Sequence, residues 1–228
     1  MTAKVRIAIL DDHPGTVDGY LYRLQEAPQI EVVGTAAYGV ELELMLASRP
    51  AEVLLLDVNV PTSPENRNPY PILHAIPQLI QSYPDLAVLI ISMLNDRHLI
   101  QGVMDAGASG YILKDDGVAW RELGAIIQLV AAGGIYLSQE AHQQLLKRQP
   151  KGTDPALTFR QQEVLSLCCA YPDISTADLA TKLNLRASTV RNLLSNAYLR
   201  LGVRTRAGAI ARARELGLIT PLPPGTET

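Results

Sequence analysis

The feature of this sequence that most restricts its fold is a fivefold alternation of short β-type runs with helix-type patterns. The β-type runs are Val5–Leu10, Ile30–Thr35, Val53–Val58, Ala87–Ser92 and Gly110–Leu113. Helix-type patterns lie near residues 15–27, 39–48, 71–82, 96–106 and 117–132. Wholly apolar stretches such as 53–56 are typical of strands buried on both faces of a parallel sheet. The alternation predicts an α/β fold, a flavodoxin-like doubly wound five-stranded parallel sheet in the order 2-1-3-4-5.

Polar residues stand where four of these runs end. Asp11 and Asp12 follow the first run, Asp57 lies in the third, Ser92 ends the fourth, and Lys114 follows the fifth. In the order 2-1-3-4-5 these strand ends are neighbours, so the side chains are expected to meet in one crevice. Packed carboxylates repel one another unless a cation compensates, and oxygen ligands suit Mg²⁺. A carboxylate, a divalent cation, an ammonium and a hydroxyl together can accept a phosphoryl group.

Charge is distributed unevenly along the chain. Residues 1–130 contain 8 Lys and Arg against 16 Asp and Glu, whereas residues 157–219 contain 9 against 4. The net charge of the whole chain is −3. A basic unit joined to an acidic one indicates a polyanion partner for the basic unit. On charge alone, a chance scatter of solvated side chains remains the alternative.

The C-terminal part of the sequence has helix signals only. Thr158 with Gln161, and Ser175 with Asp178, are capping patterns ahead of apolar positions. A short helix, a tight turn and a longer helix over about 187–201 indicate a helix-turn-helix. The adjacent Cys168 and Cys169 are expected to be helix core rather than a redox or metal site.

The segment between the two parts has its own pattern. An amphipathic stretch from Ser138 to Arg148 predicts a short helix capped by Ser138. A polar run over 149–155, with two prolines and a glycine, predicts the linker. The expected division is therefore 1–133, 134–156 (a linker with a short helix), 157–219 and a disordered tail at 220–228.

Four stretches of the N-terminal part resemble a receiver domain: Asp11-Asp12-His13-Pro14, Leu56-Asp57-Val58-Asn59-Val60-Pro61, Ser92, and Gly107–Asp115. The resemblance implies that Asp57 is the phosphoacceptor, and that Asp11, Asp12, Asp57 and the backbone carbonyl of Asn59 hold Mg²⁺. It also implies that Lys114 contacts the acyl phosphate, with Ser92 as the switch hydroxyl and Tyr111 as the switch aromatic. Taken singly, a strand-end Asp is more often a helix cap or a turn residue.

The loop after Asp57 departs from that family. Residues Thr62–Pro71 form a longer connection than receiver domains usually have, and it contains no glycine. Because the loop flanks the expected phosphorylation site, it can alter metal affinity, phosphate lifetime or the choice of kinase. The sequence leaves these three alternatives open.

The C-terminal part resembles a LuxR-type helix-turn-helix in three stretches: Leu157–Leu165, Thr189-Val190-Arg191-Asn192, and Leu201–Arg206. Together with the stretch Gly133–Ser138, this identifies the chain as a member of the NarL/FixJ-like response regulators. Arg191, Asn192 and Ser195 share one helix face, where Arg can read guanine and Asn can read adenine. The other expected DNA contacts, mainly to phosphates, are Arg186, Ser188, Thr189, Arg200, Arg204 and Arg206.

The sequence departs from the LuxR-type pattern at two positions of the expected DNA-binding helix. Leu193 stands where the family commonly has His, and Arg186 stands where an N-capping Ser is usual. Either change can shift the start of the helix and its base contacts. For any single residue of this face, the alternative is an ordinary solvated helix surface.

The expected function is a cytoplasmic, phosphorylation-controlled transcription regulator that binds double-stranded DNA as a homodimer and is phosphorylated by a sensor histidine kinase. Phosphorylation is expected to turn Tyr111 inward and to repack the face formed by residues 96–106, 110–113 and 117–132. The alternative is a phosphorylation-independent DNA-binding regulator whose receiver domain serves as a dimerisation module. An enzyme, such as a Mg²⁺-dependent phosphatase, is disfavoured because no D-x-D-x-T pattern is present, and no membrane segment is expected.

Overall fold

The predicted strands form one parallel sheet in the computed structural model, which describes residues 4–147 and 157–221. The strands are β1 (Val5–Leu10), β2 (Ile30–Ala36), β3 (Val53–Asp57), β4 (Ala87–Ser92), β5 (Gly110–Leu113) and β6 (Tyr136–Leu137). They lie in the order β2-β1-β3-β4-β5-β6. The predicted order of the first five strands is confirmed. The sixth strand was not predicted, because two residues are too few to display an alternating pattern.

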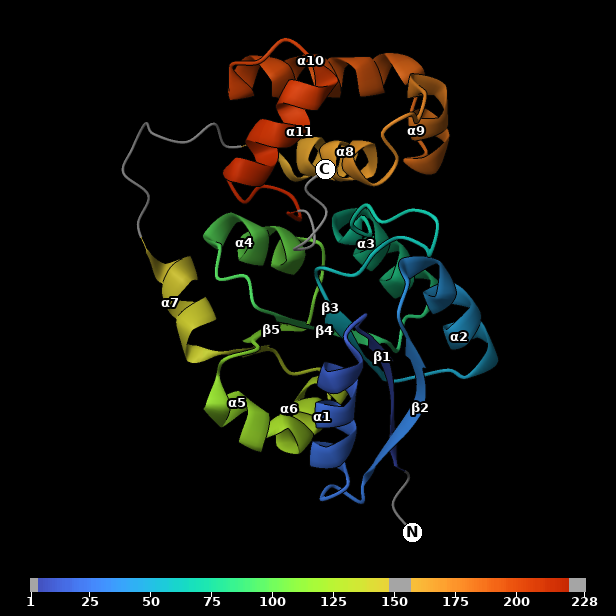
Figure 1. Cartoon of the computed structure of the whole chain (residues 1–228), viewed down its shortest axis with the longest axis vertical. Helices are drawn as coiled ribbons and strands as arrows, with labels where there is room; N and C mark the ends of the chain where they lie inside the picture. The colour runs from blue at the N-terminus through green and yellow to red at the C-terminus, as the bar shows by residue number, and fades with distance from the viewer. Residues whose placement is uncertain (1–3, 148–156, 222–228) are drawn as a thin grey trace.

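Helices cover both faces of this sheet (Figure 1). One face carries α1 (Pro14–Leu24), α5 (Gly117–Arg121) and α6 (Leu123–Ala131); the other carries a 3₁₀ turn (Gly39–Glu41), α2 (Leu42–Ser48), α3 (Ile72–Ser82) and α4 (Arg97–Asp105). The single helix expected over 117–132 is two helices, because Glu122 leaves the helical conformation with φ −100° and ψ 11°. Every residue of β3 is buried, as its apolar sequence requires.

A short helix, α7 (Gln139–Leu146), follows β6 and packs beside α4 and β5 (Figure 1). Ser138 occupies its N-cap position, but the Ser138 side chain does not cap the helix, so that part of the prediction is wrong. The hydroxyl of Ser138 instead accepts a hydrogen bond from the backbone N–H of Leu113 at 3.3 Å. The Ser138 hydroxyl therefore bonds to the last residue of β5 and not to a free N–H group at the start of α7. The expected linker at 149–155 lies outside the described residues.

The C-terminal part contains α8 (Phe159–Ala170), α9 (Thr176–Lys182), α10 (Ala187–Leu201) and α11 (Arg206–Glu215). Thr158 and Gln161 form the predicted capping box, and Ser175 accepts from the N–H of Asp178 at 3.1 Å. Asn184 adopts a left-handed conformation in the turn between α9 and α10, with φ 51°. The helix, tight turn and longer helix are therefore present as expected.

Apolar packing joins the two parts of the chain. One buried cluster covers the α1 and α6 face of the sheet. A second cluster begins on the other face and continues through α3 and α4 into α8, α10 and α11. Cys168 and Cys169 belong to this second cluster and are free thiols, and burial raises the pKa of Cys168 to about 11. Their expected role as helix core is confirmed.

The end of the described chain also joins this packing. Leu218, Ile219 and Thr220 are buried, so Thr220, the first residue of the expected disordered tail, is packed against the protein. Residues 222–228 of that tail lie outside the described residues. Among the helices of 4–147 and 157–221, none is both long and apolar enough to cross a bilayer.

The pairing of β6 depends on Gly110. A Cβ atom at this position would collide with the backbone carbonyl of Tyr136 and lie 2.8 Å from Leu89 Cδ1. We expect Gly110→Ala to lower the free energy of unfolding by about 1–3 kcal/mol, as overpacking usually does. Gly19→Ala in α1 is the control, since nothing lies within 4 Å of its added Cβ; it should stabilise by about 0.5–1 kcal/mol. Urea unfolding measures both, and an unchanged Gly110→Ala midpoint would contradict the prediction.

Candidate functional site

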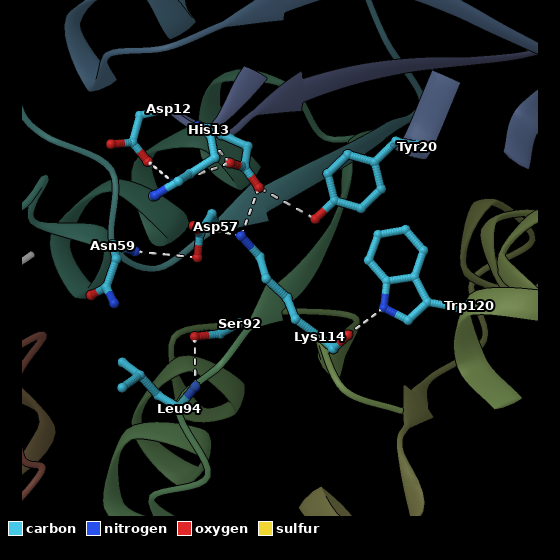
Figure 2. Close-up of polar contacts among 10 residues, drawn as sticks. Asp12, His13, Tyr20, Asp57, Asn59, Ser92, Leu94, Lys114 and Trp120 are labelled. Carbon is cyan, nitrogen blue, oxygen red and sulfur yellow. Dashed lines mark hydrogen bonds and ion pairs between the residues drawn. The ribbon is translucent and has the colours of Figure 1, made fainter. Parts of the chain in front are cut away.

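The carboxyl ends of β1, β3 and β5 bring three charged side chains together (Figure 2). The Nζ atom of Lys114 lies 2.8 Å from Asp57 Oδ2 and 2.8 Å from Asp11 Oδ2. Both carboxylates are nearly buried, with Asp11 3 % and Asp57 5 % exposed. Residues separated by about a hundred positions in the sequence thus form one ion-paired cluster, because neighbouring parallel strands end at the same edge of the sheet.

The ionisation of this cluster follows from its burial. Burial raises the pKa of Asp57, although the ammonium of Lys114 opposes the rise. Burial lowers the pKa of Lys114, but the carboxylates of Asp57 and Asp11 outweigh it and raise that pKa overall. Lys114 therefore keeps its proton at this site. A nearby cation stabilises the ionised form of Asp57.

Four side chains at the crevice could hold a metal ion. Oxygen or nitrogen atoms of Asp11, Asp12, His13 and Asp57 all lie within 4.8 Å of one another. His13 was not among the predicted ligands. Its ring Nδ1 atom lies 2.9 Å from Asp12 Oδ1, and its backbone N–H donates to Asp11 Oδ1 at 2.9 Å (Figure 2). Asn59 donates its backbone N–H to Asp57 Oδ1 at 3.3 Å, and its own side-chain oxygen is buried without a hydrogen-bond partner.

The predicted switch residues lie beside the cluster. Ser92 is fully buried, and its hydroxyl accepts from the N–H of Leu94 at 3.1 Å (Figure 2). Tyr111 is also buried, and its hydroxyl donates to the Leu94 carbonyl at 2.6 Å. The ring that was expected to turn inward is thus inward in this structure. Of the face expected to repack, α4 and β5 are packed against α7.

Two aromatic residues complete the crevice. The hydroxyl of Tyr20 donates to Asp11 Oδ2 at 3.4 Å, and burial raises the pKa of Tyr20. Its ring stacks on Trp120 at 5.0 Å between centroids, and the indole N–H of Trp120 donates to the Lys114 carbonyl (Figure 2). The pair holds the loop after β5, and with it Lys114, against α1. Nothing in the local sequence around Tyr20 indicated this contact.

The second candidate site is the outer face of α10. Arg191, Asn192 and Ser195 are exposed, while Val190 and Leu194 on the same helix are buried, as the pattern predicted. Arg186 is the N-cap residue of α10 and its side chain makes no capping bond. Other expected contact residues that are exposed are Ser188, Thr189, Arg200 and Arg204.

Arg206, another expected DNA contact, is held by a bond within the chain. Its guanidinium donates to the Ile174 carbonyl at 2.6 Å, and the residue is only partly exposed. This bond fastens the start of α11 to the turn before α9. Arg206 therefore has a structural partner within the chain, whereas the side chains of Arg191 and Asn192 point to solvent.

Known proteins resemble this chain over most of its length. The family described as response regulator receiver domain matches residues 7–123. The transcriptional regulatory protein MctR of Rhizobium johnstonii is 32 % identical, over 95 % of this chain and 96 % of that protein. The DNA-binding transcriptional activator DevR/DosR of Mycobacterium tuberculosis is 28 % identical, over 93 % of this chain and 95 % of that protein.

Solved structures share the fold. RcsB from Salmonella enterica serovar Typhimurium, bound to promoter rprA in the presence of the phosphomimetic BeF3-, superposes with a TM-score of 0.64 at 21 % identity, covering 92 % of this chain and 98 % of that chain. A structure of two RcsB dimers bound to two parallel DNAs gives a TM-score of 0.59 at 22 % identity, covering 95 % of this chain and 100 % of that chain. The likeness therefore includes both the sheet and the helical part.

The ion pairs of Lys114 with Asp11 and Asp57 should contribute to the stability of the fold. Lys114→Met leaves Asp11 and Asp57 buried without their cation, so we expect the free energy of unfolding to fall by about 3–5 kcal/mol. Adding Asp57→Asn should restore part of the loss, because one buried charge is then removed. Urea unfolding in chelator-containing buffer measures the effect. Lys4→Met, at an exposed position, is the control and should change stability by less than about 0.5 kcal/mol; an equal effect of the two Lys variants would contradict the prediction.

Proposed function

The chain belongs to the response regulator family through its receiver domain, and we propose that phosphorylation of Asp57 controls its binding to DNA as a transcription regulator. The observation that carries the proposal is the position of Asp57: it ends β3, is nearly buried, and is paired with Lys114 at 2.8 Å beside Asp11. A carboxylate placed in this way can act as a nucleophile toward a phosphoryl group.

Mg²⁺ fits the acidic crevice. The donor set is made of oxygen atoms from Asp11, Asp12 and Asp57, which lie within 4.8 Å of one another. The resemblance to receiver domains adds the backbone carbonyl of Asn59 as a further ligand. When bound, the ion neutralises charge that develops on the transferred phosphoryl oxygens.

The side chains of the crevice have separate roles in phosphoryl transfer. An Asp57 oxygen forms the new P–O bond as the bond from phosphorus to the donor nitrogen or oxygen breaks. Lys114 keeps its proton and holds a positive charge against the group that is added. Ser92 lies at the end of β4, next to β3, where its hydroxyl can bond to that group once it leaves the N–H of Leu94. Tyr20 and Trp120 keep Lys114 in place.

The other assignments follow from this function. We infer a receiver domain at 1–133, a linker at 134–156 and a DNA-binding domain at 157–219. A sensor histidine kinase is the phosphoryl donor, and a homodimer places two copies of α10 on half-sites about 10 bp apart. A soluble, cytoplasmic protein without catalytic turnover of its own suits a regulator that resembles MctR and DevR/DosR.

DNA contact is assigned to the exposed face of α10. Arg191 and Asn192 lie where they can reach base edges, and Ser195 lies one turn further on. Arg186, Ser188, Thr189, Arg200 and Arg204 can reach phosphates, which set the register of the helix in the groove. Arg206 is assigned a supporting role, since its guanidinium is already bonded to Ile174.

The phosphoacceptor is tested by Asp57→Asn. This change keeps the size of the side chain but removes the nucleophilic carboxylate, so labelling by a small acyl phosphate donor should be lost completely. Asp12→Asn should weaken labelling without abolishing it, because only a metal ligand is changed. Labelling that survives Asp57→Asn would contradict the assignment. If wild-type protein binds DNA equally with and without the donor, the phosphorylation-independent alternative is correct.

Base reading is tested by Arg191→Ala and Asn192→Ala. On a duplex selected from a random pool by the wild-type protein, each should lose about 1–3 kcal/mol of binding and relax the preference at one base pair. Arg212→Ala is the control, because Arg212 lies on α11 and pairs with Glu215 at 2.8 Å. Fluorescence anisotropy at fixed salt measures the losses. Equal effects of all three changes would contradict base reading by Arg191 and Asn192.

A further inference from the structure

The long loop after Asp57 is an ordered hairpin. A bridge pairs Pro61 with Pro69, and Thr62 donates both its N–H and its hydroxyl to the Asn68 carbonyl, at 2.8 and 2.9 Å. The Thr62 carbonyl accepts from the N–H of Val40 at 3.0 Å, which fastens the hairpin to the receiver side. The loop that the sequence singled out as unusual thus has a defined shape, here named the 61–69 hairpin.

The tip of the 61–69 hairpin reaches the helical part of the chain. The Asn66 side-chain amide donates to the Ala170 carbonyl at 2.8 Å. Ala170 is the last residue of α8, and the final carbonyls of a helix have no partner within it. The Asn66 amide is oriented because its oxygen accepts from the backbone and side-chain N–H groups of Asn68, at 3.1 and 2.9 Å. A receiver residue therefore caps the C-terminus of α8, the first helix of the proposed DNA-binding domain.

The surface of α8 beneath this cap is polar although it is buried. Gln162, Glu163 and Ser166 share one face of the helix and are 8 %, 3 % and 3 % exposed. Glu163 lies 3.1 Å from His74 Nδ1 on α3, the helix that follows the hairpin. Contacts between domains that separate are more polar than permanent ones. This face suits both a packed state and a solvated state.

Contact with the receiver leaves the expected DNA-reading surface open. Helix α8 lies against α3 and α4, whereas α10 is on the far side of the helical domain (Figure 1). Arg191 and Asn192 are accordingly exposed in this arrangement. The packing therefore restricts the orientation of the helix-turn-helix relative to the receiver, and does not cover its recognition helix.

We propose that the 61–69 hairpin is an interdomain clamp, in which Asn66 ties the segment next to the phosphoacceptor to the first helix of the DNA-binding domain. The clamp rests on the proposed function for its signal. Asn59 donates its N–H to Asp57 Oδ1, and the chain leads from Asn59 into the hairpin. A phosphoryl group on Asp57 takes over that oxygen, shifts the segment after β3, and withdraws Asn66 from Ala170. The freed domain can then orient for a paired half-site.

Asn66→Asp is the sharpest test. It keeps the oxygen that accepts from Asn68 but replaces the donor to Ala170 with a second acceptor, so the hairpin stays formed while the clamp is lost. Arg67→Gln is the matched control: it changes the net charge by the same amount at the next residue, which is exposed. Energy transfer between dyes at exposed Asp18 and Asn196, carried on non-natural amino acids, reports domain separation with and without beryllium fluoride and Mg²⁺.

We expect Asn66→Asp to shift the closed-to-open ratio toward open by about threefold to tenfold, the range for one net hydrogen bond. Wild type and Arg67→Gln should open only with beryllium fluoride, and Asn66→Asp should respond to it less. If the Asn66→Asp protein without beryllium fluoride shows the same domain separation as wild type, the clamp is overturned. An undiminished beryllium fluoride response in an open Asn66→Asp protein would overturn it too. If wild type ignores beryllium fluoride while Asn66→Asp opens, the contact stands and the phosphorylation-controlled function fails.

Discussion

The ammonium of Lys114, shared between Asp11 and Asp57, is the interaction on which the rest of the site depends. Two nearly buried carboxylates next to each other would be strongly unfavourable without a cation, and the loop after β5 supplies one at 2.8 Å from each. Parallel strands make this arrangement possible, because β1, β3 and β5 present their carboxyl ends at one edge. Tyr20 and Trp120 then act on Lys114 from the side, which links α1 to the chemistry of the crevice.

Much of this could be predicted from the sequence. The apolar run ending at Asp57 indicated a central strand, and the strand order that follows from such runs brought Asp11 and Lys114 to it. The sixth strand could not be predicted, since a two-residue strand has no periodicity and its pairing depends on the absence of a side chain at Gly110. The contact of Tyr20 was equally invisible, because only the packing of α1 against α5 and α6 decides where that ring lies.

The helical part of the chain has two different sides: α8 faces the receiver, and α10 lies on the opposite side. Helix α8 is buried between its own domain and the receiver, and its receiver-facing side is polar. Helix α10 exposes the polar side chains that suit a nucleic acid and buries Val190 and Leu194. The charge difference between the two halves is therefore used at the outer surface. The surface between them combines the apolar packing of one buried cluster with hydrogen bonds such as Asn66 to Ala170 and with the pair of His74 and Glu163.

A regulator of this kind needs both phosphorylation chemistry and coupling between its domains. In this chain the two depend on different segments. Residues that carry out the chemistry lie at strand ends and are constrained by one another, whereas the hairpin lies in a connection whose length and composition vary at little cost to the sheet. Mutations in that connection can adjust how tightly the two domains are coupled while the phosphorylation apparatus is preserved. Duplicated copies of such a gene could thus diverge in sensitivity before they diverge in the signal they receive.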